Sequence, residues 1–140
     1  MAAGADEVIN LVEEPDATAA VRRRTDGNCG PDGVIEAVGK PEIWAFSIGV
    51  TRKGGRACLF GGCAAGSKAE IDTYRLHYEE VTVFGVFHHR PSYVREALDL
   101  LGEGAIKREW FIDRELRLEE VAPFFAAKAT MSSLKAAVVV

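Results

Sequence analysis

Short apolar runs alternate with helix-like stretches along the first part of this chain, and this alternation restricts the possible fold more than any other feature. The apolar runs are candidate strands at residues 7–10, 33–38, 57–60 and 81–87. Between the first three, apolar side chains recur at helical spacing over residues 15–24 and from Pro41 to Val50. Strand–helix–strand alternation predicts a parallel sheet with right-handed crossovers. The expected fold class is therefore α/β, with flanking helices.

The stretch from Lys53 to Cys63 contains the first candidate site. A glycine turn is followed by an apolar run at residues 57–60, as in a strand covered on both faces, and the run ends at Gly61 and Gly62. In an open α/β sheet, ligands bind beyond the carboxyl ends of the strands. Glycine at such an end allows the main chain to approach a ligand closely. The alternative is an ordinary turn from strand to loop.

Three successive predicted strands end in residues of this kind, and they share one edge of a parallel sheet. The residues at these ends are Val38 and Gly39, then Phe60, Gly61 and Gly62, then Phe87 and His88. A crevice at this edge could hold an extended ligand through backbone groups. The alternative is that small residues stand there only to let helices pack.

Four side chains could have a functional role, and for each of them a purely structural role is the alternative. His88 and His89 are neighbours on a predicted strand, so they point to opposite faces and suit a shared metal poorly. Cys63 could act as a nucleophile, but a small loop residue is favoured because the sequence places no base beside it. Glu36 interrupts an apolar strand and needs a partner or a polar edge, since burying an unpaired carboxylate is costly. No metal ligands and no catalytic residues are assigned.

The remaining sequence predicts further elements but no linker between domains. Ser92 is expected to cap an amphipathic helix that reaches Leu101, and residues 71–78 are expected to be irregular. Residues 110–112 are expected to be extended, 118–128 helical and 136–140 a last β-rich run. A single domain is therefore expected over residues 1–140.

Charge and hydropathy exclude several classes of partner. The net charge is −4, and the largest basic cluster is the run of three arginines at 22–24, which suits a helix carboxyl end. There is no apolar run of the ~20 residues that a membrane span requires, and the first residues do not resemble a signal peptide. We expect a cytoplasmic protein that binds neither nucleic acid nor membrane, with Cys29, Cys58 and Cys63 as free thiols.

Several motifs in order resemble the medium-chain dehydrogenase family, which includes the zinc-dependent alcohol, sorbitol and threonine dehydrogenases. The motifs are GADEVIN at 4–10, DGVIEAVG at 32–39, KGGR at 53–56, FGG at 60–62, YRLHYEE at 74–80 and GVFHH at 85–89. The resemblance implies a partial Rossmann-like domain with a doubly wound, mainly parallel sheet, which binds NAD or NADP. It implies hydride transfer between an alcohol and the nicotinamide.

The resemblance also implies roles at the three strand ends. Val38 and Gly39 would lie along the adenosine side of the cofactor. Phe60, Gly61 and Gly62 would lie beside the nicotinamide end. Phe87 and His88 would offer backbone groups to the carboxamide.

Other parts of the family pattern do not occur in this sequence. The G-x-G-x-x-G fingerprint and the ribose-binding acid would precede Met1, and so would the domain that contributes the zinc ligands. The resemblance therefore implies the carboxy-terminal part of a dehydrogenase, inactive alone, with zinc and the alcohol substrate held only by the full-length protein. Residues from about 110 to 140 would pack back toward the catalytic domain.

The resemblance also implies an exposed sheet edge, which bears on assembly. In the family strand order 3-2-1-4-5-6, residues 7–10 would form the third strand and would have no natural neighbour. The exposed sheet edge, with residues 64–73 beside it, would favour a homo-oligomer. The alternatives to an enzyme part are a non-catalytic assembly or binding module and a truncated gene product.

Overall fold

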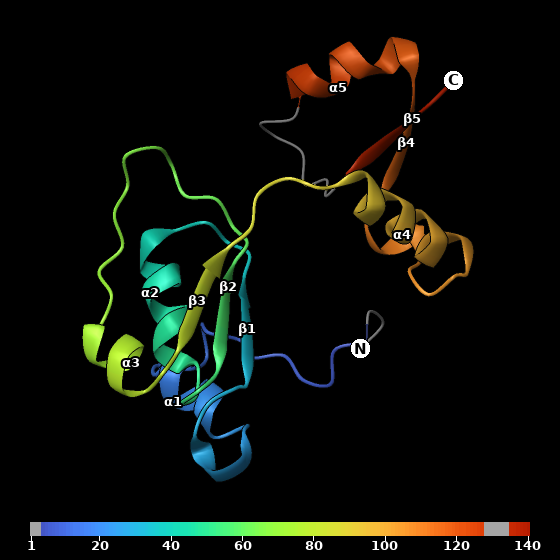
Figure 1. Cartoon of the computed structure of the whole chain (residues 1–140). Helices are drawn as coiled ribbons and strands as arrows, with labels where there is room; N and C mark the ends of the chain where they lie inside the picture. The colour runs from blue at the N-terminus through green and yellow to red at the C-terminus, as the bar shows by residue number, and fades with distance from the viewer. Residues whose placement is uncertain (1–3, 128–134) are drawn as a thin grey trace. The chain divides into compact units, whose positions relative to one another are not determined.

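A computed structural model describes residues 4–127 and 135–140 of the chain. These residues form two compact units that meet in the sequence at His88 and His89 (Figure 1). The first unit contains α1 (Ala17–Arg22), η1 (Asp26–Asn28), β1 (Gly33–Glu36), α2 (Pro41–Val50), β2 (Arg56–Leu59), α3 (Thr73–Tyr78) and β3 (Thr82–Gly85). The second contains α4 (Pro91–Gly102), η2 (Arg108–Trp110), β4 (Arg114–Arg117), η3 (Leu118–Glu120), α5 (Val121–Ala127) and β5 (Ala136–Val139).

The first unit is built on a parallel three-stranded sheet in the order β1-β2-β3 (Figure 1). The strands lie in register, so that Ile35, Cys58 and Phe84 form one row across the sheet. The predicted parallel α/β fold is confirmed, although β1 and β3 are shorter than their apolar runs and β2 is shifted by one residue.

One face of this sheet forms the core and the other is exposed. Helix α2 packs on β1 and β2, and α1 packs on α2. Ile48 of α2 and Ala57 of β2 are buried in the core together with Val81. On the opposite face, the side chains of Ile35 and Phe84 are 74% and 43% exposed.

Local sequence signals explain where the first helices begin. The Asp16 carboxylate accepts a hydrogen bond from the Ala19 N–H at 2.9 Å, which satisfies one of the free donors of the first turn of α1. Pro41 occupies the first turn of α2, where its missing N–H has no intrahelical acceptor to lose. Both helices were predicted, but α1 is confined to the middle of residues 15–24.

Two predictions for the first unit are wrong. Residues 7–10 do not form a strand. The first strand in the sheet is β1, so the backbone groups of 7–10 have no strand of the described chain beside them, and Glu7 instead pairs with Arg24 at 2.9 Å. Residues 71–78 are not wholly irregular, because the Asp72 carboxylate caps α3 through the Tyr74 N–H at 2.9 Å.

The second unit contains a parallel pair of strands, β4 and β5, with Leu116 buried. Three details differ from the sequence analysis. Ser92 is not the cap of α4, because Pro91 begins the helix and Arg90 precedes it. Trp110 ends the 3-10 helix η2 and residues 111–112 follow it, so residues 110–112 are not a strand, and β4 was not predicted. The predicted helix over 118–128 is confirmed as far as Ala127, and its last residue lies outside the described ranges.

Two further expectations concern membrane-spanning helices and the cysteines. Within the described ranges, no helix is both long and apolar enough to cross a membrane. All three cysteines are free thiols, as predicted.

Candidate functional site

A buried carboxylate shapes the turn at the end of β1. The Glu36 side chain is only 2% exposed. Its Oε1 accepts hydrogen bonds from the Val38 N–H at 2.7 Å and the Gly39 N–H at 2.8 Å. Its backbone carbonyl accepts from the N–H groups of Phe60 and Gly61, at 2.9 and 2.8 Å. One residue therefore fixes the ends of two neighbouring strands.

The two glycine turns pack directly against each other. Gly39 has a positive φ of 78°, and a Cβ added there would lie 2.5 Å from the Gly62 carbonyl oxygen. A Cβ on Gly61 would lie 2.4 Å from the Gly39 nitrogen and 2.7 Å from Glu36 Oε2. Glycine at 39 and 61 is thus required by neighbouring backbone, and this close approach brings the β1 and β2 ends together.

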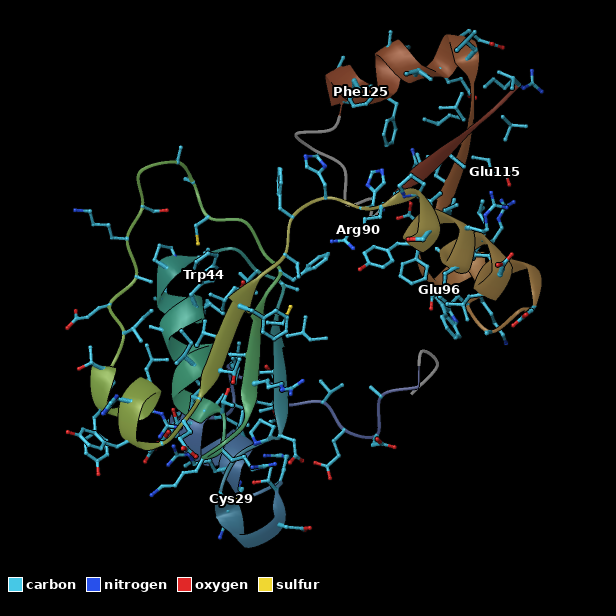
Figure 2. All side chains as sticks on the ribbon, in the orientation of Figure 1. Cys29, Trp44, Arg90, Glu96, Glu115 and Phe125 are labelled. Atoms are coloured by element: carbon cyan, nitrogen blue, oxygen red, sulfur yellow. The ribbon has the colours of Figure 1, made fainter. Side chains whose placement is uncertain are left out.

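Helix α2 contributes an aromatic side chain to the same place. The Trp44 Nε1–H donates to the Gly61 carbonyl at 2.9 Å. The hydrogen bond holds the indole at the end of the sheet where β2 terminates (Figure 2).

A cavity of about 570 Å³ opens at these strand ends. Its volume lies within the range of small-molecule sites. Its lining is mainly apolar and comprises Pro41, Trp44, Leu59, Phe60, Gly61, Gly62, Cys63, Ala64, Ser67, Lys68, Ala69, Gly85, Val86 and Phe87. Three aromatic side chains and two adjacent glycines suit a flat aromatic ring. The hydroxyl of Ser67 and the ammonium group of Lys68 could orient such a ring through polar contacts.

The predicted strand-end residues divide into two groups. Phe60, Gly61, Gly62 and Phe87 line the cavity. Val38, Gly39 and His88 are not in its lining. Val38 and Gly39 are joined to it through the Glu36 turn. Next to the cavity, the rings of Phe87 and His88 meet edge to face with centroids 3.8 Å apart. Their assignment as cofactor-binding residues stays a prediction.

Cys63 lines the cavity, but its surroundings disfavour a nucleophilic thiolate. Partial burial, followed by the Glu36 and Glu42 carboxylates, raises the pKa of the Cys63 thiol. A raised pKa keeps the sulfur protonated at neutral pH, and the thiolate is the reactive form. The interpretation of Cys63 as a small loop residue is therefore favoured.

The described ranges contain no cluster of three His, Cys, Asp or Glu side chains that could hold a metal ion. His88 and His89 belong to no such group within those ranges. β3 ends at Gly85 and His88 has a positive φ of 60°, so the strand geometry assumed for this histidine pair does not apply.

Sequence reasoning missed two contributors to the site. Trp44 is not among the predicted site residues, and no local pattern could show that its N–H reaches Gly61, 17 positions away. The loop residues from Ala64 to Ala69 that line the cavity were assigned only to an oligomer edge. For Glu36, the expected partner exists, and it is the backbone of the following turn.

Comparison with known proteins identifies the family. The family model described as "Zinc-binding dehydrogenase" matches residues 1–103. That is more than half of the chain, which therefore belongs to the zinc-binding dehydrogenase family.

Individual relatives agree with this assignment. D-arabinitol dehydrogenase 1 of Uromyces fabae is 26% identical over 134 residues, which are 96% of this chain and 38% of the relative. A structure from Sinorhizobium meliloti, described as a zinc-binding dehydrogenase bound to NADP, is 28% identical to this chain. The two superimpose with a TM-score of 0.85 over 98% of this chain and 40% of that protein's chain. An alcohol dehydrogenase of a Thermus species is 27% identical with a TM-score of 0.81, over 94% and 37%. This chain therefore spans about two-fifths of such relatives.

Proposed function

We propose that this chain is the carboxy-terminal part of the cofactor domain of an NAD(P)-dependent, zinc-type alcohol or polyol dehydrogenase. The observation that carries the proposal is the aromatic-lined cavity at the carboxyl ends of parallel strands, beside Gly61 and Gly62. Family membership and relatives described as alcohol and arabinitol dehydrogenases support it.

In this proposal the cavity accommodates the nicotinamide end of the cofactor. Trp44, Phe60 and Phe87 supply apolar and aromatic surface for the ring, and they shield it from water. Glu36 keeps the glycine turns in place, with Val38 and Gly39 toward the adenosine side and Phe87 and His88 near the carboxamide. When bound, the nicotinamide supplies the hydride chemistry.

Other parts of the reaction are not assigned to these residues. The sequence contains no G-x-G-x-x-G fingerprint for the pyrophosphate, and no zinc ligand is assigned. We propose that the chain alone does not oxidise alcohols, and that residues from about 110 to 140 pack toward the catalytic domain of the full-length protein.

The test is NADH binding followed by the fluorescence of Trp44. In a Trp110→Phe background, Trp44 is the remaining indole, and NADH in the cavity is expected to quench it saturably. A ligand that binds only the folded state adds about 2.7 kcal/mol of stability at a hundredfold excess over its dissociation constant. Phe60→Ala should weaken binding by about tenfold because it removes an exposed cavity aromatic with little packing.

Tyr78→Ala provides the matched control, since Tyr78 is also an exposed aromatic of the first unit but lies outside the cavity. Quenching that Phe60→Ala and Tyr78→Ala weaken equally, or no NADH effect on either fluorescence or unfolding, would contradict a nicotinamide site. Alcohol oxidation by the purified chain would contradict the proposed inactivity alone.

A second candidate function is assembly, and the row of Ile35, Cys58 and Phe84, in which Ile35 and Phe84 are exposed, favours it. If this face mediates a homo-oligomer, Phe84→Ser should reduce the sedimenting mass at a fixed concentration, because it removes apolar area from the contact. Val12→Ser is the control, since Val12 is 94% exposed but outside the sheet. An identical mass for wild type and Phe84→Ser would exclude this face from assembly.

A further inference from the structure

A second cavity, of about 310 Å³, lies at the opposite ends of the strands. Its lining residues precede the strands in the chain and are Arg22, Asn28, Cys29, Arg52, Lys53, Arg75 and Glu79. None of them lines the cavity beside Gly61. Cys29 and Trp44 mark the two ends of the unit in Figure 2. This second cavity is thus separate from the proposed cofactor site.

The lining carries four cations and one carboxylate. Glu79 pairs with Arg75, with Oε2 2.7 Å from Nη1, and more loosely with Lys53, with Oε1 3.8 Å from Nζ. Asp32 pairs with Arg52 at 2.6 Å. Even with Asp32 included, positive groups outnumber negative ones, so the cavity favours an anion.

Two of these arginines are held in place by the carboxyl end of α2. Arg22 Nη2 donates to the Gly49 carbonyl at 3.1 Å, and Arg75 Nη2 donates to the Thr51 carbonyl. The Nε–H groups of both arginines are buried and have no hydrogen-bond partner among the described residues. Leaving a buried donor unsatisfied is costly. Glu79 Oε2 is likewise buried, and its contact is the Arg75 ion pair. Because the Nε atoms are buried, a ligand in the cavity would meet the terminal Nη groups of the two arginines, whose positions the Gly49 and Thr51 carbonyls fix.

Interaction with the helix dipole accounts for only part of this cluster. Cations at the carboxyl end of α2 offset its partial negative charge, which explains Arg22 and Arg75. Arg52 bonds instead to Asp32 and to the Lys53 carbonyl, and the Lys53 side chain is 78% exposed. A pre-positioned pair of arginines with an exposed lysine beside them resembles the donor set that oxyanions require.

We propose that this cavity binds a phosphate group, either as free phosphate or on a small phosphate ester. Arg22 and Arg75 supply fixed N–H donors, and Lys53 adds a flexible positive charge. The volume is at the lower end for small-molecule sites, which suits a compact ligand. This proposal does not depend on the proposed dehydrogenase function.

Alkylation of Cys29 reports on this cavity directly. Cys29 is exposed and lines the cavity, whereas Cys58 and Cys63 lie elsewhere and serve as internal references. Iodoacetamide is uncharged, so the positive side chains of the cavity do not change the rate at which it meets Cys29. Saturating phosphate is expected to slow Cys29 alkylation by about threefold through lost access, without slowing the other two, as measured by peptide mass spectrometry.

Three ligands and two variants complete the test. We compare inorganic phosphate, glycerol phosphate and malonate, which represent free phosphate, a phosphate ester and a dicarboxylate. Potassium chloride at equal ionic strength is the control for non-specific screening. Lys53→Gln should raise the phosphate dissociation constant by about three- to tenfold. Lys107→Gln removes the same charge from an exposed site in the other unit and should leave the constant unchanged.

Several results would overturn the proposal. Protection by phosphate no greater than by chloride would do so, as would equal weakening by the two lysine variants. Tighter protection by malonate than by either phosphate ligand would replace phosphate with a dicarboxylate as the ligand. Because Lys53 is exposed and weakly paired, its replacement tests binding without endangering the fold.

Discussion

Gly61→Ala is expected to destabilise the first unit strongly and to abolish the proposed NADH binding there. The added Cβ would lie 2.4 Å from the Gly39 nitrogen and 2.9 Å from the Ala37 carbonyl carbon. Both are backbone atoms, so the turns after β1 and β2 would have to separate. Overpacking of this kind costs about 1–3 kcal/mol, and we expect the upper end. The Trp44 and Glu36 hydrogen bonds to Gly61 would weaken with it.

Gly62→Ala is the matched control for this prediction. A Cβ on Gly62 meets no atom within 4 Å, and the residue does not require a positive φ. Urea unfolding followed by Trp44 fluorescence, in a Trp110→Phe background, compares the two variants in the first unit. Equal midpoints for Gly61→Ala, Gly62→Ala and wild type would show that the two turns are not packed as the structure has them.

The strands and the position of the candidate strand-end residues could be predicted because their signals are local. Apolar runs interrupted by glycine identified β1, β2 and β3, and the parallel α/β rule then put Phe60, Gly61, Gly62 and Phe87 at one edge of the sheet. Boundaries were less certain, because the side-chain pattern continues beyond the residues that pair in the sheet.

The rest depended on contacts between distant parts of the chain. The strand at residues 7–10 was predicted from its residue types, although the family strand order already left it without a natural neighbour. Without a neighbour its backbone groups cannot pair in a sheet, and the strand does not form. β4 was not predicted because its alternation of charged and apolar residues is short and Leu116 is its only buried residue. Trp44 was not predicted as a site residue, because its hydrogen bond to Gly61 depends on the fold.

Glu36→Ala is expected to produce the second large loss of stability. It removes the acceptor for the Val38 and Gly39 N–H groups and leaves an internal hole, because Glu36 is 2% exposed. Unsatisfied buried donors cost about 1–3 kcal/mol each. We expect a loss of about 2–5 kcal/mol in urea unfolding, similar to large-to-small changes in a core. Glu42→Gln, on the exposed first turn of α2, should change stability little.

Glu36→Gln separates the charge of this residue from its shape. The amide oxygen can still accept from the turn, so the loss of stability should be smaller than for Glu36→Ala. The Glu36 carboxylate is the second cause, after partial burial, of the raised pKa of Cys63. Removing its charge should therefore lower that pKa, and alkylation of Cys63 should begin at lower pH than in wild type. An unchanged pH profile with retained stability would mean that the carboxylate charge does not reach the cavity, and that Glu36 acts only as a hydrogen-bond acceptor for the turn.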